Sequence, residues 1–255
     1  MSGPLLKVDH LAKRFGGIVA TDDLVLGVAP GELHAVIGPN GAGKTTLIAQ
    51  LSGQLRPDSG RIHFAGTDIT ALPVHKRSAL GLARSFQITS LFLDFSALDN
   101  VALAVQAHDG HSFRFWRNAR MEKKLREVAR AALDRVGLGV RADWPASALS
   151  HGEHRQLELA MALAANPRML LLDEPMAGLG PEESARMVAM LRALKAELTI
   201  LLVEHDMEAV FALADRITVL VYGRVIATGA PDAIRANPLV REAYLGEDEV
   251  EGGHG

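Results

Sequence analysis

The nine residues from Gly38 to Thr46 restrict the fold of this chain more than any other stretch. Their sequence, Gly-Pro-Asn-Gly-Ala-Gly-Lys-Thr-Thr, has the spacing G-x-x-x-x-G-K-[ST], which is typical of a loop that binds a polyphosphate. The mostly apolar stretch 34–37 precedes the loop as a strand candidate, and the stretch 47–51 after it opens a helix. A strand, such a loop and a helix in this order predict an α/β fold with a nucleotide-binding site.

Each residue type in this loop has a physical reason. Glycines let the backbone wind tightly and turn consecutive N–H groups inward, toward a phosphate that also meets the positive end of the following helix. Lys44 can reach the β- and γ-phosphates, and the hydroxyl of Thr45 can ligate Mg²⁺. A glycine-rich turn without a ligand would explain the glycines but not Lys-Thr at this offset. We therefore predict phosphate contacts from Gly38, Pro39, Asn40, Gly41, Ala42, Gly43, Lys44, Thr45 and Thr46.

The composition excludes several classes of protein. With 255 residues, 48% of them hydrophobic and 22% charged, the chain is long enough to bury a large core. It has no cysteine, which excludes disulfides and thiolate metal sites and fits a reducing compartment. The net charge of −3 gives no electrostatic footprint for nucleic acid. We see no secretion signal and no apolar run of membrane-spanning length, so we expect any role at a membrane to be carried out from outside the bilayer.

Two further apolar runs end in polar side chains. The run 169–172 suits a strand of a parallel sheet covered on both faces, and it ends in Asp173 and Glu174. Because ligands of such sheets lie at the carboxyl ends of the strands, Asp173 is placed to hold Mg²⁺ through water, and Glu174 to orient or deprotonate an attacking water. On its own, the Asp-Glu-Pro stretch equally suits the start of a loop. The run 198–203 leads to His205, and a lone histidine there is usually structural unless other motifs accompany it.

Three more features each have two interpretations. Phe15, which is followed by two glycines, is either a stacking platform for a planar base or a packed core residue. Ser150 and Glu153 form a capping box for an ordinary helix, yet a helix N-terminus with Ser150 and Gly152 is also an anion site. The apolar cluster 91–95 is either part of the core or a docking groove for a partner helix.

Six motifs follow one another in a fixed order over nearly the whole chain. They are Phe15, the loop 38–46, Gln87, the stretch Leu-Ser-His-Gly-Glu at 149–153, the pair Asp173 and Glu174, and His205. In this order they resemble the nucleotide-binding subunits of ABC transporters. Within that family, the stretches 15–17, 113–117 and 243–247 look like those of ATP-binding subunits of branched-chain amino-acid importers, and the related urea and amide importer subunits look similar.

The resemblance implies a fold and a domain organisation. The fold is α/β, a P-loop NTPase core with a mainly parallel sheet, an antiparallel β subdomain and an inserted helical signature subdomain. Residues 1–255 would form one such domain. The core and the β subdomain would take about 1–90 and 165–240, the helical subdomain about 91–164, and the acidic end 247–255 would be a mobile tail.

The resemblance also implies a role for each motif in binding and hydrolysing ATP with Mg²⁺. Phe15 would stack on adenine, and Lys44, Thr45 and Thr46 would bind the phosphates and the metal. Gln87 would sense Mg²⁺ and the attacking water, so the predicted metal set is Thr45, Gln87 and Asp173. Glu174 would be the catalytic base and His205 would contact the γ-phosphate, which makes Glu174, His205 and Gln87 the predicted catalytic set. Ser150 and Gly152 would serve the ATP of a partner subunit.

The expected partners follow from the same resemblance. They are a second nucleotide-binding subunit in a head-to-tail homodimer or heterodimer, transmembrane permease subunits and, indirectly, a solute-binding protein; no nucleic acid is expected. The protein would then be cytoplasmic and peripheral on the inner face of the cell membrane.

Two departures from the family pattern concern the partner's ATP. The signature motif usually reads Leu-Ser-Gly-Gly-Gln, whereas this chain has His151 and Glu153 in place of Gly and Gln. Glutamate keeps the capping box but adds a negative charge near the partner's nucleotide, which predicts weaker closure. Where the family often has Asp in Ser-Ala-Leu-Asp, this chain has Gly180, which leaves the contact across the dimer open.

Other functions remain open at this stage. An ABC ATPase for another solute, such as urea, an amide or a lipid-linked substrate, would carry the same motifs. Soluble ABC-type ATPases that act on DNA or ribosomes usually carry long coiled-coil insertions or two such domains, and neither is present here. A P-loop kinase for a small molecule would need neither the Ser150 and Gly152 motif nor His205.

Overall fold

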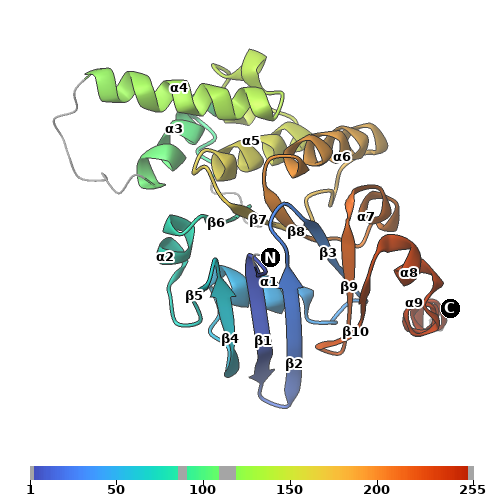
Figure 1. Cartoon of the computed structure of the whole chain (residues 1–255). Coiled ribbons are helices and arrows are strands. Elements are labelled where there is room, and N and C mark those ends of the chain that lie inside the picture. The colour runs from blue at the N-terminus through green and yellow to red at the C-terminus, as the bar shows by residue number, and fades with distance from the viewer. Residues whose placement is uncertain (1–2, 86–90, 109–118, 252–255) are drawn as a thin grey trace.

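The structure, a computed structural model, describes residues 3–85, 91–108 and 119–251 (Figure 1). Its larger sheet has six strands in the order β10-β9-β3-β8-β7-β6, and neighbouring strands are parallel except in the β9–β10 hairpin. The mainly parallel sheet predicted from the sequence is therefore confirmed. The strands are β3 (Leu33–Ile37), β6 (Leu82–Arg84), β7 (Met169–Asp173), β8 (Thr199–Val203), β9 (Arg216–Val221) and β10 (Arg224–Gly229).

The central strands of this sheet are covered on both faces. Every residue of β3, β7 and β8 is buried, which explains why these segments are almost continuously apolar. Because side chains alternate along a strand, Leu170 and Leu172 of β7 face one apolar cluster, and Met169 and Leu171 face another. The first cluster is shared with α5 (His151–Leu163) and α6 (Pro181–Lys195), and the second with α1 (Lys44–Ser52).

A smaller antiparallel sheet lies beside α1, with strand order β2-β1-β4-β5 (Figure 1). Its buried side chains, among them Leu6, Val8 and Ile62, belong to the same apolar cluster as α1. The predicted antiparallel β part is confirmed in this sheet. Its strands are β1 (Leu6–Phe15), β2 (Ile18–Val28), β4 (Ser59–Phe64) and β5 (Thr67–Asp68), and the short helix α2 (Val74–Ala79) follows them.

Between β6 and β7 the chain forms α3 (Ala97–His108), α4 (Ala119–Arg135) and α5, which we call the helical lobe. Figure 1 shows these helices gathered on one side of the six-stranded sheet. Leu98 of α3, Leu133 of α4 and Leu157 of α5 belong to one buried cluster that also contains Leu170 of β7 and Leu191 of α6. The lobe and the sheet therefore share a single continuous core.

The helix α7 (Met207–Leu213) precedes β9, and after β10 the chain forms α8 (Pro231–Ala236) and α9 (Pro238–Glu251). Residues 247–251 are thus helical, where the sequence suggests a mobile tail, and 252–255 lie outside the described residues. Val240 and Tyr244, one turn apart on α9, pack on a cluster with Ile234 of α8, and this docking supports the helix. No helix in the described ranges is long and apolar enough to cross a membrane.

Candidate functional site

The loop between β3 and α1 needs glycine because other backbone comes too close for a side chain. A Cβ atom on Gly38 would lie 2.1 Å from the carbonyl oxygen of Leu220, and one on Gly43 would lie 2.1 Å from that of Ala20. Gly43 also has a φ of 102°, which favours glycine, and it begins α1 without a side-chain cap. The N–H groups at the start of α1 are therefore free of a capping side chain and suited to an anion.

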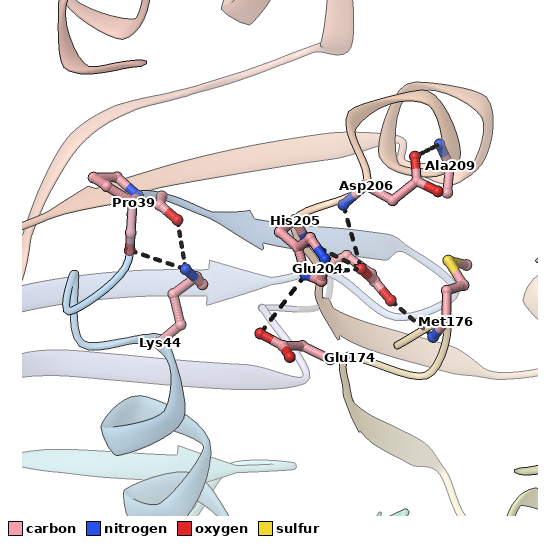
Figure 2. A network of polar contacts seen from close by, with 9 residues as sticks. Pro39, Lys44, Glu174, Met176, Glu204, His205, Asp206 and Ala209 are labelled. Carbon is pink, nitrogen blue, oxygen red and sulfur yellow. Dashed lines mark hydrogen bonds and ion pairs between the residues drawn. The ribbon is translucent and has the colours of Figure 1, made fainter. Parts of the chain in front are cut away.

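Lys44, the first residue of α1, is buried and folded back over its own loop. Its Nζ donates a hydrogen bond to the carbonyl oxygen of Pro39 at 3.0 Å and another to that of Gly38 (Figure 2). These bonds hold the ammonium group above the loop, where an incoming phosphate would meet it. The two bonds thus anchor the loop to its own lysine.

Asp173 ends β7 with its side chain almost fully buried. Its Oδ2 lies 2.9 Å from Arg84 on the neighbouring strand β6, a partner that the sequence did not suggest. Burial raises the pKa of Asp173 above its ordinary value of 3.8, and the charge and hydrogen bond of Arg84 only partly oppose this shift. Its other oxygen, Oδ1, is buried and has no hydrogen-bond partner among the described residues. A buried carboxylate oxygen without a hydrogen-bond partner is suited to bind a cation, or a water molecule that is itself bound to a cation.

Glu174 follows directly and turns the chain out of the sheet. Its φ of 48° is left-handed, a conformation that costs a non-glycine residue about 1–2 kcal/mol. The turn is held because the N–H of Glu174 donates to the carbonyl oxygen of Val203 on β8 at 2.9 Å. The side chain is 38% exposed, and its Oε1 lies 3.8 Å from Nδ1 of His205. The carboxylate and the imidazole therefore face each other across neighbouring strand ends (Figure 2).

Glu204 is the residue of this site that the motifs do not predict. It stands between β8 and His205, is 0% exposed, and accepts hydrogen bonds from three backbone N–H groups. The sequence carried one signal for Glu204. This charged residue directly follows the apolar strand β8, and the neighbouring parallel strand β7 also ends in carboxylates.

Ser150 begins α5 with the predicted capping box. Its Oγ accepts from the N–H of Glu153 at 3.2 Å, and Oε2 of Glu153 accepts from the N–H of Ser150 at 2.8 Å. Oε1 of Glu153 lies 2.5 Å from Nε of Arg141, so the extra negative charge has a cationic partner. A Cβ atom on Gly152 would lie 2.5 Å from Oε1 of Glu183 on α6, so a larger residue here would make the Glu183 side chain shift.

A cavity of about 390 Å³ opens beside this helix start. Its lining includes Ser150, Gly152 and Gln156, the two arginines Arg141 and Arg186, and the two glutamates Glu153 and Glu183. The helix N-terminus and Arg186 favour an anionic group here, whereas Arg141 is paired with Glu153.

The predicted site residues thus fall into two groups. The loop 38–46, the pair Asp173 and Glu174, and His205 lie at the carboxyl ends of the adjacent strands β3, β7 and β8. Phe15, at the end of β1, is 49% exposed and lies under Nζ of Lys13 at 5.6 Å, so it is not a core residue. Ser150 and Gly152 stand at the start of α5 in the helical lobe, where Gly152 lies next to Glu183 of α6 and the neighbouring Glu153 pairs with Arg141 of η1 (Gly139–Arg141). Gln87 lies outside the described residues.

Comparisons with known families agree with this geometry. Residues 21–177 match the family model described as ABC transporter, and residues 224–250 match the one described as branched-chain amino acid ATP-binding cassette transporter. The chain is 40% identical to the high-affinity branched-chain amino acid transport ATP-binding protein BraF of Pseudomonas aeruginosa, over 97% of this chain and 100% of that protein. It is 38% identical to LivG of Escherichia coli, a protein of the same description, again over 97% and 100%.

A third relative is described by a different transport process. The lipopolysaccharide export system ATP-binding protein LptB of Acidithiobacillus ferridurans is 36% identical over 95% of this chain and 97% of its own length.

Solved structures share the fold over nearly the full chain. A nucleotide-free ATP-binding cassette from an ABC transporter aligns with a TM-score of 0.82 and 28% identity, covering 94% of this chain and 98% of that one. A cassette of an ABC transporter in its ADP conformation aligns with a TM-score of 0.84 and 28% identity, covering 96% and 100%.

Proposed function

Since this chain belongs to the ABC transporter family of ATP-binding and ATP-hydrolysing subunits, we propose that it powers an importer of branched-chain or related amino acids. The observation that carries this assignment is the full-length identity of 40% to BraF, together with the match of 224–250 to the C-terminal model of the branched-chain amino acid group. The family match alone supports only an ABC ATPase, because it covers the part that ABC transporters share.

The nucleotide is held by groups at the carboxyl edge of the parallel sheet. The loop 38–46 and the N-terminus of α1 surround the β- and γ-phosphates with N–H groups, and Lys44 adds a positive charge. Phe15 stacks on the adenine, which its exposed position at the end of β1 supports.

Mg²⁺ is held by the hydroxyl of Thr45 and, through water, by Asp173. The buried and unpartnered Oδ1 of Asp173 fits this role among the described residues. When bound, the ion neutralises charge on the β- and γ-phosphate oxygens. Gln87 completes the proposed set, although its structure lies outside the described residues.

Hydrolysis uses one water, which attacks the γ-phosphorus while the bond to the bridging oxygen breaks and ADP leaves. Glu174 orients this water and accepts its proton, which its partly exposed carboxylate at a strand end allows. His205, 3.8 Å from that carboxylate, donates a hydrogen bond to the γ-phosphate.

The working unit is a head-to-tail dimer on the cytoplasmic face of a membrane. Ser150 and Gly152 of each subunit contact the ATP seated on the Lys44 of the other, and the capped start of α5 beside the 390 Å³ cavity supports this role. The permease docks on the helical lobe, where Phe92 and Phe95 stack at 5.3 Å beside a groove of about 370 Å³. A solute-binding protein delivers the amino acid to that permease.

Turnover with ATP alone tests the enzymatic part of this proposal. Glu174→Gln should abolish hydrolysis and let ATP-bound dimers accumulate, as measured by phosphate release and by sedimentation. Hydrolysis that survives this substitution would contradict the role of Glu174, and a loss of turnover without any dimer would contradict the shared site.

A second candidate function is the export of a lipid-linked substrate, which the 36% identity to LptB favours. The two candidates differ in the membrane protein that the chain binds. Isolation of the complex from a membrane extract should yield an amino-acid permease, and a lipid-handling membrane partner in its place would favour the second candidate.

A further inference from the structure

Glu204 is a fully buried carboxylate at the end of β8, between the two loops that carry Glu174 and His205. Its Oε1 accepts a hydrogen bond from the N–H of Met176 at 2.9 Å. Its Oε2 accepts from the N–H of His205 at 3.0 Å and from that of Asp206 at 3.3 Å. One side chain therefore connects the loop after β7 with the loop after β8 (Figure 2).

The partners of Glu204 lie close in the chain to the two proposed reacting groups, Glu174 and His205. Met176 follows Glu174 by two residues, and His205 follows Glu204 directly. Nδ1 of His205 lies 3.7 Å from Oε2 of Glu204 and 3.8 Å from Oε1 of Glu174, so the imidazole stands between a buried carboxylate and a solvent-facing one. Asp206, the third contact, caps α7 by accepting from the N–H of Ala209 at 3.1 Å, which ties this loop to a rigid helix.

The chemistry of this contact calls for a carboxylate. Three N–H groups point at the two oxygens, and a carboxylate accepts at both. A glutamine has the same shape but offers one oxygen and one NH₂ group. In either orientation its NH₂ group would face at least one N–H donor, leaving a buried backbone group without a partner.

We propose that Glu204 is a positioning residue for ATP hydrolysis, which fixes the distance between Glu174 and His205. The proposal rests on the roles given above to those two side chains. It predicts a loss mainly in the chemical step, because the three hydrogen bonds of Glu204 go to the loops after β7 and β8, and the proposed phosphate contacts come from the loop 38–46.

The test is a comparison of Glu204→Gln with a matched substitution elsewhere in the same sheet. Glu32→Gln is the control, because Glu32 also accepts from a backbone N–H, that of Ala29, and also lies beside a histidine, His34, but at the opposite end of β3. We expect kcat of Glu204→Gln to fall by about 10- to 100-fold, because small misplacements of reacting groups cause losses of this size. KM for ATP should stay within about twofold of wild type. Glu32→Gln should keep kcat, while its thermal unfolding midpoint should fall by about as much as that of Glu204→Gln.

The outcomes separate this inference from the proposed function. If wild type hydrolyses ATP and Glu174→Gln does not, but Glu204→Gln keeps full kcat, the positioning role is wrong and the function stands. An equal loss of kcat in Glu32→Gln would reduce the effect to general destabilisation and overturn the proposal.

Glu204→Asp serves if the glutamine variant does not fold, since it keeps the charge but withdraws it by about 1.5 Å, one carbon–carbon bond. It too should lose kcat without a change in KM. Failure of both variants to fold, with Glu32→Gln folded, would make Glu204 a stability residue and end the proposal.

Discussion

At the scale of single residues, Glu153 departs from the signature motif of the family, which usually has Gln at this position, and the surroundings of its charge decide the effect. The sequence predicts a bare negative charge beside the nucleotide of a partner subunit. In the structure the same carboxylate caps α5 and lies 2.5 Å from Arg141, whose guanidinium stacks over Trp144 at 4.4 Å. Glu153 therefore brings its own neutralising cation, and Arg141 becomes part of this surface.

Glu153→Gln tests how these two charges act in the dimer. Glutamine at position 153 keeps the capping box. Because it removes the negative charge that pairs with Arg141, this arginine can face an anionic triphosphate, and ATP-dependent dimerisation should strengthen by about two- to fivefold. Sedimentation in the presence of ATP, with Glu174→Gln present to prevent turnover, measures the change. Arg141→Gln is the matched control and should weaken the dimer, because it leaves Glu153 uncompensated; a clear loss of dimer in Glu153→Gln would refute the argument.

At the scale of helices and strands, the sequence predicts what is local and misses what joins distant elements. The loop 38–46, the buried strands and the capped start of α5 follow from patterns within about ten residues. By contrast, Arg77 of α2 is fully buried and donates to the carbonyl oxygens of Gln50 and Leu51 at the end of α1, at 2.7 and 2.8 Å. Nothing near Arg77 in the sequence indicates this contact, because its partners are chosen only when the elements pack.

The same distinction applies to the candidate site. Asp173, Glu174 and His205 are recognisable because each follows an apolar run, and their convergence follows from the parallel sheet. Arg84 is not recognisable in this way, because its partner Asp173 lies 89 residues away in the chain, and the contact of Glu204 with Met176, 28 residues away, likewise appears only in the folded structure.

Arg77→Met tests the contact between α2 and α1. Methionine fills much of the volume but leaves four carbonyl oxygens without their donor, including those of Leu72 and Thr70. The free energy of unfolding should fall by about 3 kcal/mol, as measured in urea. The neighbouring and exposed Lys76→Met should change it by less than about 0.5 kcal/mol, and equal effects in the two variants would show that the buried bonds contribute nothing.

At the scale of the whole molecule, three exposed apolar side chains stand together just before the helical lobe. Phe92, Leu93 and Phe95 are each about half exposed, and they precede α3 next to the groove that α3 and α4 line. Three exposed apolar side chains beside a groove of mixed polar and apolar lining suit a helix of another protein. The sequence left open whether this cluster is core or a docking surface, and its exposure favours docking.

Phe92→Glu tests this docking surface in the assembled transporter. A charge among the exposed apolar side chains beside the groove should uncouple amino-acid uptake from hydrolysis, reducing uptake about tenfold or more while the ATPase activity of the isolated subunit stays near wild type. Leu239→Glu is the matched control, because Leu239 is similarly exposed but lies on α9. Uptake in vesicles and phosphate release by the isolated subunit measure the two effects, and an equal loss of both activities would argue against docking at Phe92.

The apolar cluster that runs from α3 and α4 through α5 into β7 and α6 has a practical consequence for engineering. A segment taken from a homologue would bring apolar side chains whose shapes fit the neighbours of that homologue and not those of this protein. Chimeras that exchange the helical lobe should therefore also exchange the facing residues Leu170, Leu172 and Leu191, so that the side chains of the lobe and of the sheet still pack together.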